Sequence, residues 1–199
     1  MSLNALIYTL FIDPLLSGPR KAICDRIDPA ARVIDIACGP GTLAMELAGK
    51  ASSVTGIDLD GNLISFAAAR AAKKGIPNIS FESRDASHLS VYHDAEFDVA
   101  VTSMAVHQFP EELALSIIGE MKRIAHKVII ADYNCPLPGG FSGSLAHGIE
   151  RITKGDHYRN FRNYMSRGGL QWFTSSSGLE ISWETTRGNG VFVIVGCEG

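Results

Sequence analysis

The chain has 199 residues, of which 46% are hydrophobic and 20% are charged, and its formal net charge is −3 at pH 7. This length and composition predict one globular domain with a sizeable core. The weak negative charge disfavours a nucleic-acid partner, because phosphates require a basic surface.

The N-terminal segment, residues 1–16 (MSLNALIYTLFIDPLL), is apolar but contains Asp13 and Pro14. It is shorter than the ~20 apolar residues of a membrane span and lacks the basic start of a secretory signal. We expect residues 1–28 to form a helical lid, with Tyr8 turned toward bound substrate. The alternatives are a helix packed on the domain without ligand contact and a helix lying on a membrane surface.

Strand and helix patterns then alternate along the chain. Short apolar runs predict buried strands, and runs with helical periodicity and terminal charges predict helices. Such alternation predicts βαβ units and a parallel sheet covered on both faces. The predicted strands are residues 32–37, 53–59, 78–86, 96–104 and 127–134, and the predicted helices are 41–51, 60–75 and 110–125.

After residue 134 the alternation stops. Residues 144–177 are predicted to be helical and carry many basic residues, and residues 179–186 and 190–197 flank a turn, RGNG, that suits a hairpin. We therefore predict an antiparallel pair added to a parallel sheet. The four cysteines form no Cys-x-x-Cys pair, so we expect reduced thiols in a cytoplasmic protein.

A glycine turn follows the first strand. Gly39 and Gly41 precede a helix, and Asp58 ends the next strand, which loosely matches a dinucleotide fingerprint. However, Asp35 would repel a pyrophosphate, and Pro40 removes a backbone donor. A cofactor with ammonium and sulfonium charges and no phosphate suits this turn better than NAD. A nicotinamide-dependent oxidoreductase stays a weaker alternative.

Four segments in order resemble the motifs of class I S-adenosylmethionine-dependent methyltransferases. They are VIDIACGPG (33–41), VTGIDLD (54–60), SRDASHL (83–89) and FDVAVTSMAVHQF (97–109). The resemblance implies S-adenosylmethionine as cofactor and a doubly wound α/β, Rossmann-like sheet of seven strands in the order 3-2-1-4-5-7-6. It also implies one domain over residues 1–199, with residues 135–178 as a helical insertion that recognises the substrate.

The resemblance also implies the cofactor contacts. The glycine turn would hold the methionine portion, two acids would bind the amino group and the ribose, and a third would bind the adenine. The implied cofactor residues are Asp35, Ala37, Cys38, Gly39, Gly41, Asp58, Leu59, Asp85, Ala86, Ser103 and Met104.

Each acid has a simpler structural explanation. Asp35 could cap the following turn, Asp58 could be an exposed acid at a strand end, and Asp85 could form an Asx turn. Together, however, they lie at the carboxyl ends of three consecutive strands, and these ends meet at the ligand-binding edge of an open α/β sheet. The joint pattern therefore favours a cofactor site.

His107, just beyond the fourth parallel strand, is the candidate general base, because an imidazole titrates near neutral pH. The alternative is a packed, hydrogen-bonded histidine at a helix start. His147, Glu150, Asp156 and His157 have no compact ligand spacing, so no metal site is predicted.

The basic helical segment is the candidate acceptor site, with His157 and Arg159 as the first choices for substrate contact. Aromatic residues alternate there with arginines and could clamp an anionic or aromatic small molecule, although a solvated helix face is the simpler explanation. The leading hypothesis is a small-molecule methyltransferase that uses S-adenosylmethionine. A non-catalytic protein that binds the same cofactor is the alternative. The acceptor and the oligomeric state stay open.

Overall fold

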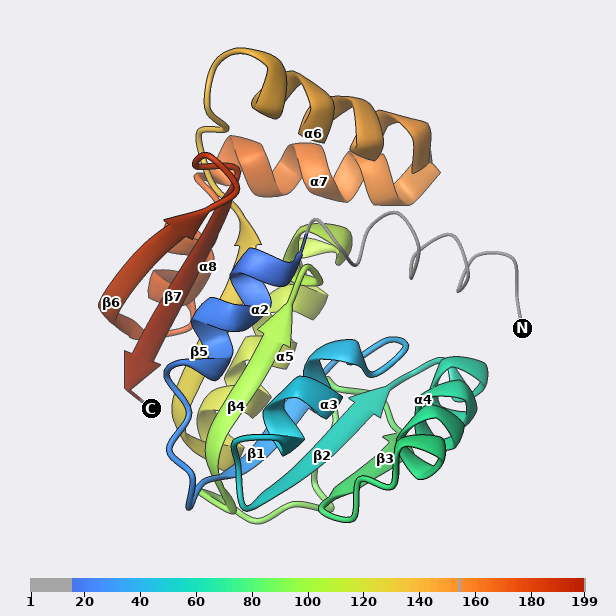
Figure 1. Ribbon diagram of the computed structural model, residues 1–199. Coiled ribbons are helices and arrows are strands. Elements are labelled where there is room, and N and C mark those ends of the chain that lie inside the picture. Colours follow the sequence, from blue (N-terminus) through green and yellow to red (C-terminus); the bar gives the residue numbers. More distant parts are fainter. Residues whose placement is uncertain (1–15, 154, 199) are drawn as a thin grey trace.

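The computed structural model describes residues 16–153 and 155–198 and contains one seven-stranded sheet (Figure 1). The strand order is β3-β2-β1-β4-β5-β7-β6, and β7 runs antiparallel to both β5 and β6. The predicted order and the terminal hairpin are therefore confirmed. The strands are β1 (Arg32–Ile36), β2 (Ser53–Asp58), β3 (Ile79–Ser83), β4 (Phe97–Ser103), β5 (Ala125–Tyr133), β6 (Glu180–Arg187) and β7 (Phe192–Glu198).

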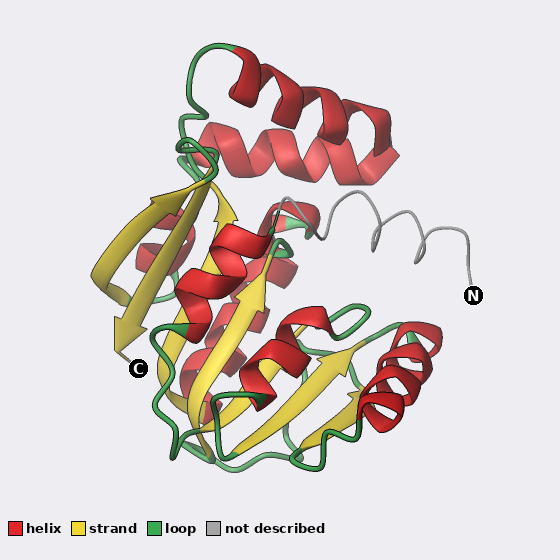
Figure 2. Ribbon diagram, viewed as in Figure 1, coloured by secondary structure: helices red, strands yellow, loops and turns green. Residues whose placement is uncertain are grey.

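The helix boundaries follow the local sequence signals. Asp60 accepts the Asn62 N–H with its side chain at the start of α4, and Gly75 ends that helix in the left-handed region at φ 66°. Figure 2 shows how the helices alternate with the strands. They are α2 (Ser17–Cys24), α3 (Thr42–Ala48), α4 (Gly61–Lys74), the 3-10 turn η2 (Val106–Gln108), α5 (Glu111–Ile124), α6 (Phe141–Thr153), α7 (Gly155–Arg167) and α8 (Leu170–Ser176).

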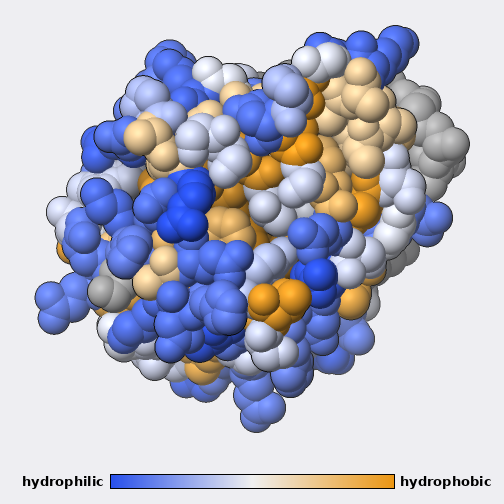
Figure 3. Space-filling view, turned by 90° about the horizontal axis from the view of Figure 1, so that it is seen from below, coloured by the Kyte–Doolittle hydropathy of each residue, from blue (hydrophilic) through white to orange (hydrophobic). Residues whose placement is uncertain are grey.

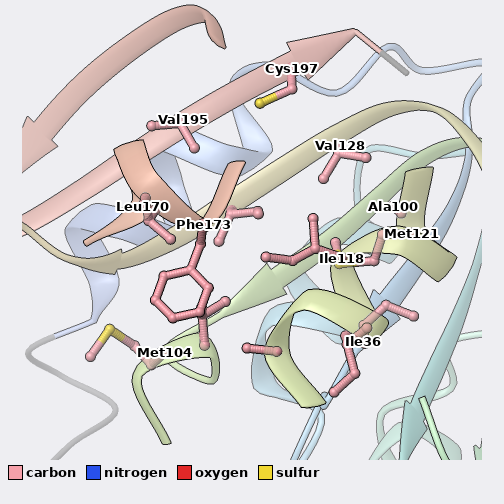
Figure 4. Packing of buried hydrophobic residues seen from close by; sticks show 14 of the residues in the cluster. Ile36, Ala100, Met104, Ile118, Met121, Val128, Leu170, Phe173, Val195 and Cys197 are labelled. Atoms are coloured by element: carbon pink, nitrogen blue, oxygen red, sulfur yellow. The ribbon is translucent and has the colours of Figure 1, made fainter. Parts of the chain in front are cut away.

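The sheet divides the core into two layers. Successive side chains of a strand point to opposite faces, so Val33 packs with α2 and α3 whereas Ile34 packs on the side of α5 and α8. Figure 4 shows Phe173 of α8 and Ile118 of α5 within the second layer. Seen from below, the molecule carries hydrophilic residues over most of its face, with apolar residues gathered toward the middle (Figure 3).

The regions at both ends of the chain differ in detail from the sequence-based expectation. Helix α2 packs on the sheet with Ile23 fully buried, so this part of the predicted lid is a core helix. The predicted insertion consists of three helices, of which α6 and α7 lie beyond the carboxyl ends of the central strands (Figure 1). No helix within residues 16–153 and 155–198 is long and apolar enough to cross a membrane.

The two turn glycines provide a stability test. A Cβ on Gly41, at φ +75°, would lie 2.8 Å from Ala67 and Phe81, whereas a Cβ on Gly39, at φ +53°, would meet no atom within 4 Å. Gly41→Ala is therefore expected to lower the free energy of unfolding by about 2–5 kcal/mol, from left-handed backbone strain and overpacking. Gly39→Ala carries only the backbone strain of ~1–2 kcal/mol. Urea unfolding of the ligand-free variants measures both, and equal losses would contradict this packing.

Candidate active site

A cavity of about 610 Å³ opens at the carboxyl ends of β1, β2 and β4. This is the edge at which open α/β sheets bind their ligands. Gly41 is the one predicted cofactor residue that does not line this cavity. The other ten do: Asp35, Ala37, Cys38, Gly39, Asp58, Leu59, Asp85, Ala86, Ser103 and Met104.

Asp35 supplies a buried carboxyl group to this cavity. Its side chain is 1% exposed, and its Oδ2 has no hydrogen-bond partner among the described residues. Burial and the nearby Asp58 carboxylate raise the pKa of Asp35 to about 8, against the opposing hydrogen bond from the Ala44 backbone N–H. The same surroundings, with burial as the main cause, raise the pKa of the Cys38 thiol far above its usual value. Because a buried carboxyl oxygen needs a partner, this position favours a ligand that brings a cation.

Asp58 holds the glycine turn in place. Its Oδ2 accepts the Gly39 N–H at 2.8 Å, and its Oδ1 accepts the Asp60 N–H at 2.9 Å. Ala37 and Met104, which follow β1 and β4, both have left-handed backbones, at φ 56° and 58°. Such backbones are rare outside glycine and cluster at ligand sites. The turn is therefore already shaped for a ligand.

The adenine end of the predicted site combines an acid and an apolar side chain. Asp85 forms the Asx turn considered above, because its Oδ1 accepts the Ser87 N–H at 2.9 Å and the Ser87 hydroxyl at 2.7 Å. These hydrogen bonds lower the pKa of Asp85. Asp85 nevertheless lines the cavity, and so does Leu59, which is 74% exposed. An exposed leucine at a cavity wall suits contact with a flat ring.

These observations fit S-adenosylmethionine. Asp35 suits its ammonium group, Asp58 suits its ribose hydroxyls, and Leu59 and Asp85 suit its adenine. Gly39 leaves open space where a Cβ would stand, so a ligand reaches the backbone there. A pyrophosphate would instead face the two acidic side chains Asp35 and Asp58 and would bring no cation to Asp35, which disfavours NAD.

A second cavity of about 430 Å³ adjoins the first. Both are lined by Leu16, Met104 and Gln108, so they meet at the end of β4. The walls of the second cavity are mostly apolar, and four polar side chains lie together on one part of it. The apolar residues include Phe141, Leu145, Ala146, Ile149, Val191 and Phe192, and the polar group is His107, Tyr133, Glu150 and His157.

His107 is at the centre of the polar group and is only 1% exposed. Its Nδ1 lies 2.5 Å from Asp132 Oδ1, and its backbone N–H donates to Asp132 Oδ2 at 3.1 Å. Its Nε2 lies 3.6 Å from Glu150 Oε1. Burial by itself would lower the pKa of His107, but Asp132 and Glu150 reverse this, so the pKa is raised overall. The predicted base thus has a carboxylate that fixes its ring.

Glu150 connects His107 to two further side chains. It is 4% exposed, its Oε1 accepts the Tyr133 hydroxyl at 2.8 Å, and its Oε2 lies 3.1 Å from His157 Nδ1. Three residues of this cluster were not predicted as site residues from the sequence: Asp132, Tyr133 and Glu150. Asp132 could have been predicted, because it is an acidic residue within an apolar strand, and the same pattern drew attention to Asp35.

The predicted substrate residues His157, Arg159 and Tyr8 differ in where they lie relative to the second cavity. His157 lines the second cavity, and its contact with an acceptor stays a prediction. Arg159 forms an ion pair with Asp156 at 2.9 Å, is 73% exposed and lines neither cavity, so its predicted acceptor contact has no support. Tyr8 lies outside the described residues.

The chain shares sequence similarity with a methyltransferase family and with named methyltransferases. A family described as a methyltransferase domain matches residues 33–127, which include the four motifs. The matched domain and the fold together support the class I S-adenosylmethionine-dependent methyltransferase family for this chain. A 2-heptyl-1-hydroxyquinolin-4(1H)-one methyltransferase of Mycobacteroides abscessus is 32% identical over 41% of this chain and 35% of its own.

Two further similarities extend beyond the motifs. An uncharacterised Mycobacterium tuberculosis protein is 28% identical over 72% of this chain and 47% of its own length. The chain therefore spans about half the length of the curated relatives it matches first. A magnesium protoporphyrin IX methyltransferase from Synechocystis has the same fold at 16% identity, with a TM-score of 0.65 over 94% of this chain and 87% of that one.

The raised pKa of Asp35 predicts how this methyltransferase domain binds its cofactor as pH changes. In the ligand-free protein this carboxyl is mostly protonated below pH about 8. An ammonium group favours the carboxylate, so S-adenosylhomocysteine should displace a proton, and its affinity should rise up to about tenfold per pH unit between about pH 6 and 7.5. Calorimetry in buffers of different ionisation enthalpy measures the proton, and Asp35→Asn should abolish the release. Release that persists in Asp35→Asn would contradict the assignment.

Proposed function

We propose that this domain transfers a methyl group from S-adenosylmethionine to an apolar small molecule. The observation that carries the proposal is the junction of the two cavities. Met104, whose left-handed backbone turns the chain at the end of β4, lines both, and so do Leu16 and Gln108. A donor in the first cavity and an acceptor in the second would therefore meet beside Met104. Such fixed alignment is a main source of rate in a displacement reaction.

S-adenosylmethionine, when bound, supplies an electrophilic methyl group. The residues of the second cavity have to bind the acceptor and help it to lose a proton as its oxygen or nitrogen gains the methyl group. We assign this activation to the polar group around His107, where an acceptor hydroxyl would find an imidazole and a carboxylate. As the acceptor gained the methyl carbon, the C–S bond of the sulfonium would break to leave S-adenosylhomocysteine, and the acceptor proton would pass to the polar group.

The cavity walls support an apolar acceptor with a single polar end. A volume of about 430 Å³ is typical of small-molecule sites. Most of the lining is aliphatic or aromatic, whereas the polar groups lie together. The name of the Mycobacteroides relative describes an acceptor with an aromatic ring, an alkyl chain and a hydroxyl group, which has this distribution. We therefore place alkylated hydroxyaromatic compounds first among the candidate acceptors.

A ligand panel followed by an acceptor panel tests this proposal. S-adenosylhomocysteine at 100 times its dissociation constant should stabilise the protein by ~2.7 kcal/mol, and NAD should not. Turnover with labelled S-adenosylmethionine is then measured on naphthols, alkylphenols and hydroxyquinolines, with polar amines as the contrast. Stabilisation by NAD alone would contradict the cofactor. Binding of S-adenosylhomocysteine without turnover of any acceptor would favour the non-catalytic alternative.

A cavity-filling variant separates the two sites. Ala146 is buried in the second cavity and does not line the first. Ala146→Phe should reduce turnover of the hydroxyaromatic acceptors while it leaves the affinity for S-adenosylhomocysteine unchanged. Equal turnover in the folded variant would mean that the acceptor binds elsewhere.

A further inference from the structure

We propose that His107, Glu150 and His157 bind a divalent transition-metal ion, with Zn²⁺ as the best fit, on the polar side of the second cavity. The three residues come from three different elements, η2, α6 and α7, and His107 is more than 40 residues away from the other two in the sequence. Their potential ligand atoms all lie within 4.8 Å of one another. Two imidazoles and one carboxylate form a ligand set that suits zinc and leaves one position open.

The distances fit such an ion after small side-chain movements. Ligands bound at ~2.0–2.2 Å in a tetrahedral site lie about 3.3 Å from one another. Here Glu150 Oε1 lies 3.6 Å from His107 Nε2, and Glu150 Oε2 lies 3.1 Å from His157 Nδ1. Glu150 therefore lies between the two imidazoles at close to the spacing that coordination requires.

The residues behind these ligands form the outer shell that metal sites usually have. Asp132 Oδ1 lies 2.5 Å from His107 Nδ1, so that nitrogen keeps its proton and Nε2 presents a lone pair. Asp132 is itself fixed, because it also accepts the backbone N–H groups of His107 and Tyr133. On the other side, the Tyr133 hydroxyl donates to Glu150 Oε1 at 2.8 Å. Both His107 and Glu150 are thus held in orientation by neighbouring residues.

Charge balance supports the same conclusion. Asp132 is 0% exposed and Glu150 is 4% exposed, so two carboxylates are buried within reach of one imidazole ring. Buried carboxylates are costly unless cations are close. A divalent ion bound to His107 and Glu150 would neutralise both, while the histidines stay neutral.

The open position of the ion would face the acceptor cavity. All three ligands line that cavity, whose remaining walls are mostly apolar. If the proposed function holds, the acceptor oxygen would take this position, and the ion would lower the pKa of the acceptor hydroxyl. In the metal-loaded protein His107 would then assist proton removal as a ligand of the ion and not as the base itself. Metal binding itself does not depend on methyl transfer, so the two proposals can fail separately.

Metal binding is tested on the full, untagged chain without cofactor or acceptor. The protein is stripped with a chelator and titrated with Zn²⁺ by calorimetry and with Co²⁺ by visible absorption. We expect one equivalent of Zn²⁺, and a Co²⁺ spectrum with the strong d–d bands of four- or five-coordinate cobalt. Glu150→Gln and His157→Asn should each weaken Zn²⁺ binding at least 100-fold. Asp132→Asn, which changes only the outer shell, should weaken it about 10–100-fold.

Two controls make the result decisive. His147→Asn, on α6 and outside the ligand group, should bind Zn²⁺ like the wild type. Circular dichroism checks that each variant is folded, and Glu150→Gln is the least disruptive of them because its amide oxygen can still accept from Tyr133. Absence of Zn²⁺ binding, weak octahedral Co²⁺ bands, or unchanged affinity in folded Glu150→Gln and His157→Asn would overturn the proposal.

Discussion

Asp58→Ala is expected to weaken binding of S-adenosylhomocysteine by roughly 10²–10⁴-fold, because two charge-assisted hydrogen bonds to the ribose are lost at ~1.5–3 kcal/mol each. Each carboxylate oxygen already accepts one backbone N–H, from Gly39 or Asp60, and keeps a second lone pair for a ligand hydroxyl. The variant also loses these two caps of the turn. Its free energy of unfolding should therefore fall by about 1–3 kcal/mol.

Asp98→Ala is the matched control for Asp58→Ala. Asp98 accepts the Arg32 N–H at 2.7 Å near the start of β4, at the edge of the sheet opposite the cavity. It should lose a similar stability and no affinity. Calorimetric titration measures the affinity of both variants for S-adenosylhomocysteine. An unchanged dissociation constant in folded Asp58→Ala would place the ribose elsewhere.

His107→Asn is expected to lower kcat by about 10²–10⁴-fold, the usual contribution of a group that assists proton removal in the transition state. The affinity for S-adenosylhomocysteine should stay within about twofold, because His107 does not line the cofactor cavity. Turnover is measured with the best acceptor of the panel described above.

His126→Asn provides the comparison for His107→Asn. His126 is an exposed histidine near the start of β5 and should tolerate the change without loss of turnover. A His107→Asn protein that keeps kcat within tenfold of the wild type would show that this side chain only packs. A joint fall in kcat and cofactor affinity would indicate a folding defect.

The sheet and the cofactor side of the site could be predicted because the signals are local. Apolar runs and helix caps fixed the predicted strands to within a few residues of their observed bounds. Asp35 and Asp58 then fell at or near strand ends, and strand ends in a parallel sheet share one edge. No knowledge of helix packing was needed for that inference.

The acceptor side depends on packing that the sequence does not reveal. His157 and Arg159 are two positions apart on α7, so they point to nearly opposite sides of the helix, and only one can face the cavity. The orientation of α7 is set by Phe161 and Tyr164, which are buried in the core. Their alternation with arginines had suggested a surface clamp, whereas they anchor the helix. The same packing brings Glu150 to His107.

Cys38 shows how the cofactor cavity tolerates a thiol beside an electrophile. Its side chain lines the cavity assigned to S-adenosylmethionine, an alkylating agent. Only a thiolate is a strong nucleophile, and burial next to Asp35 and Asp58 holds the pKa of Cys38 far above the physiological range. The thiol therefore stays protonated and inert. Burial, with a smaller contribution from the two acids, thus protects this thiol from methylation by the cofactor.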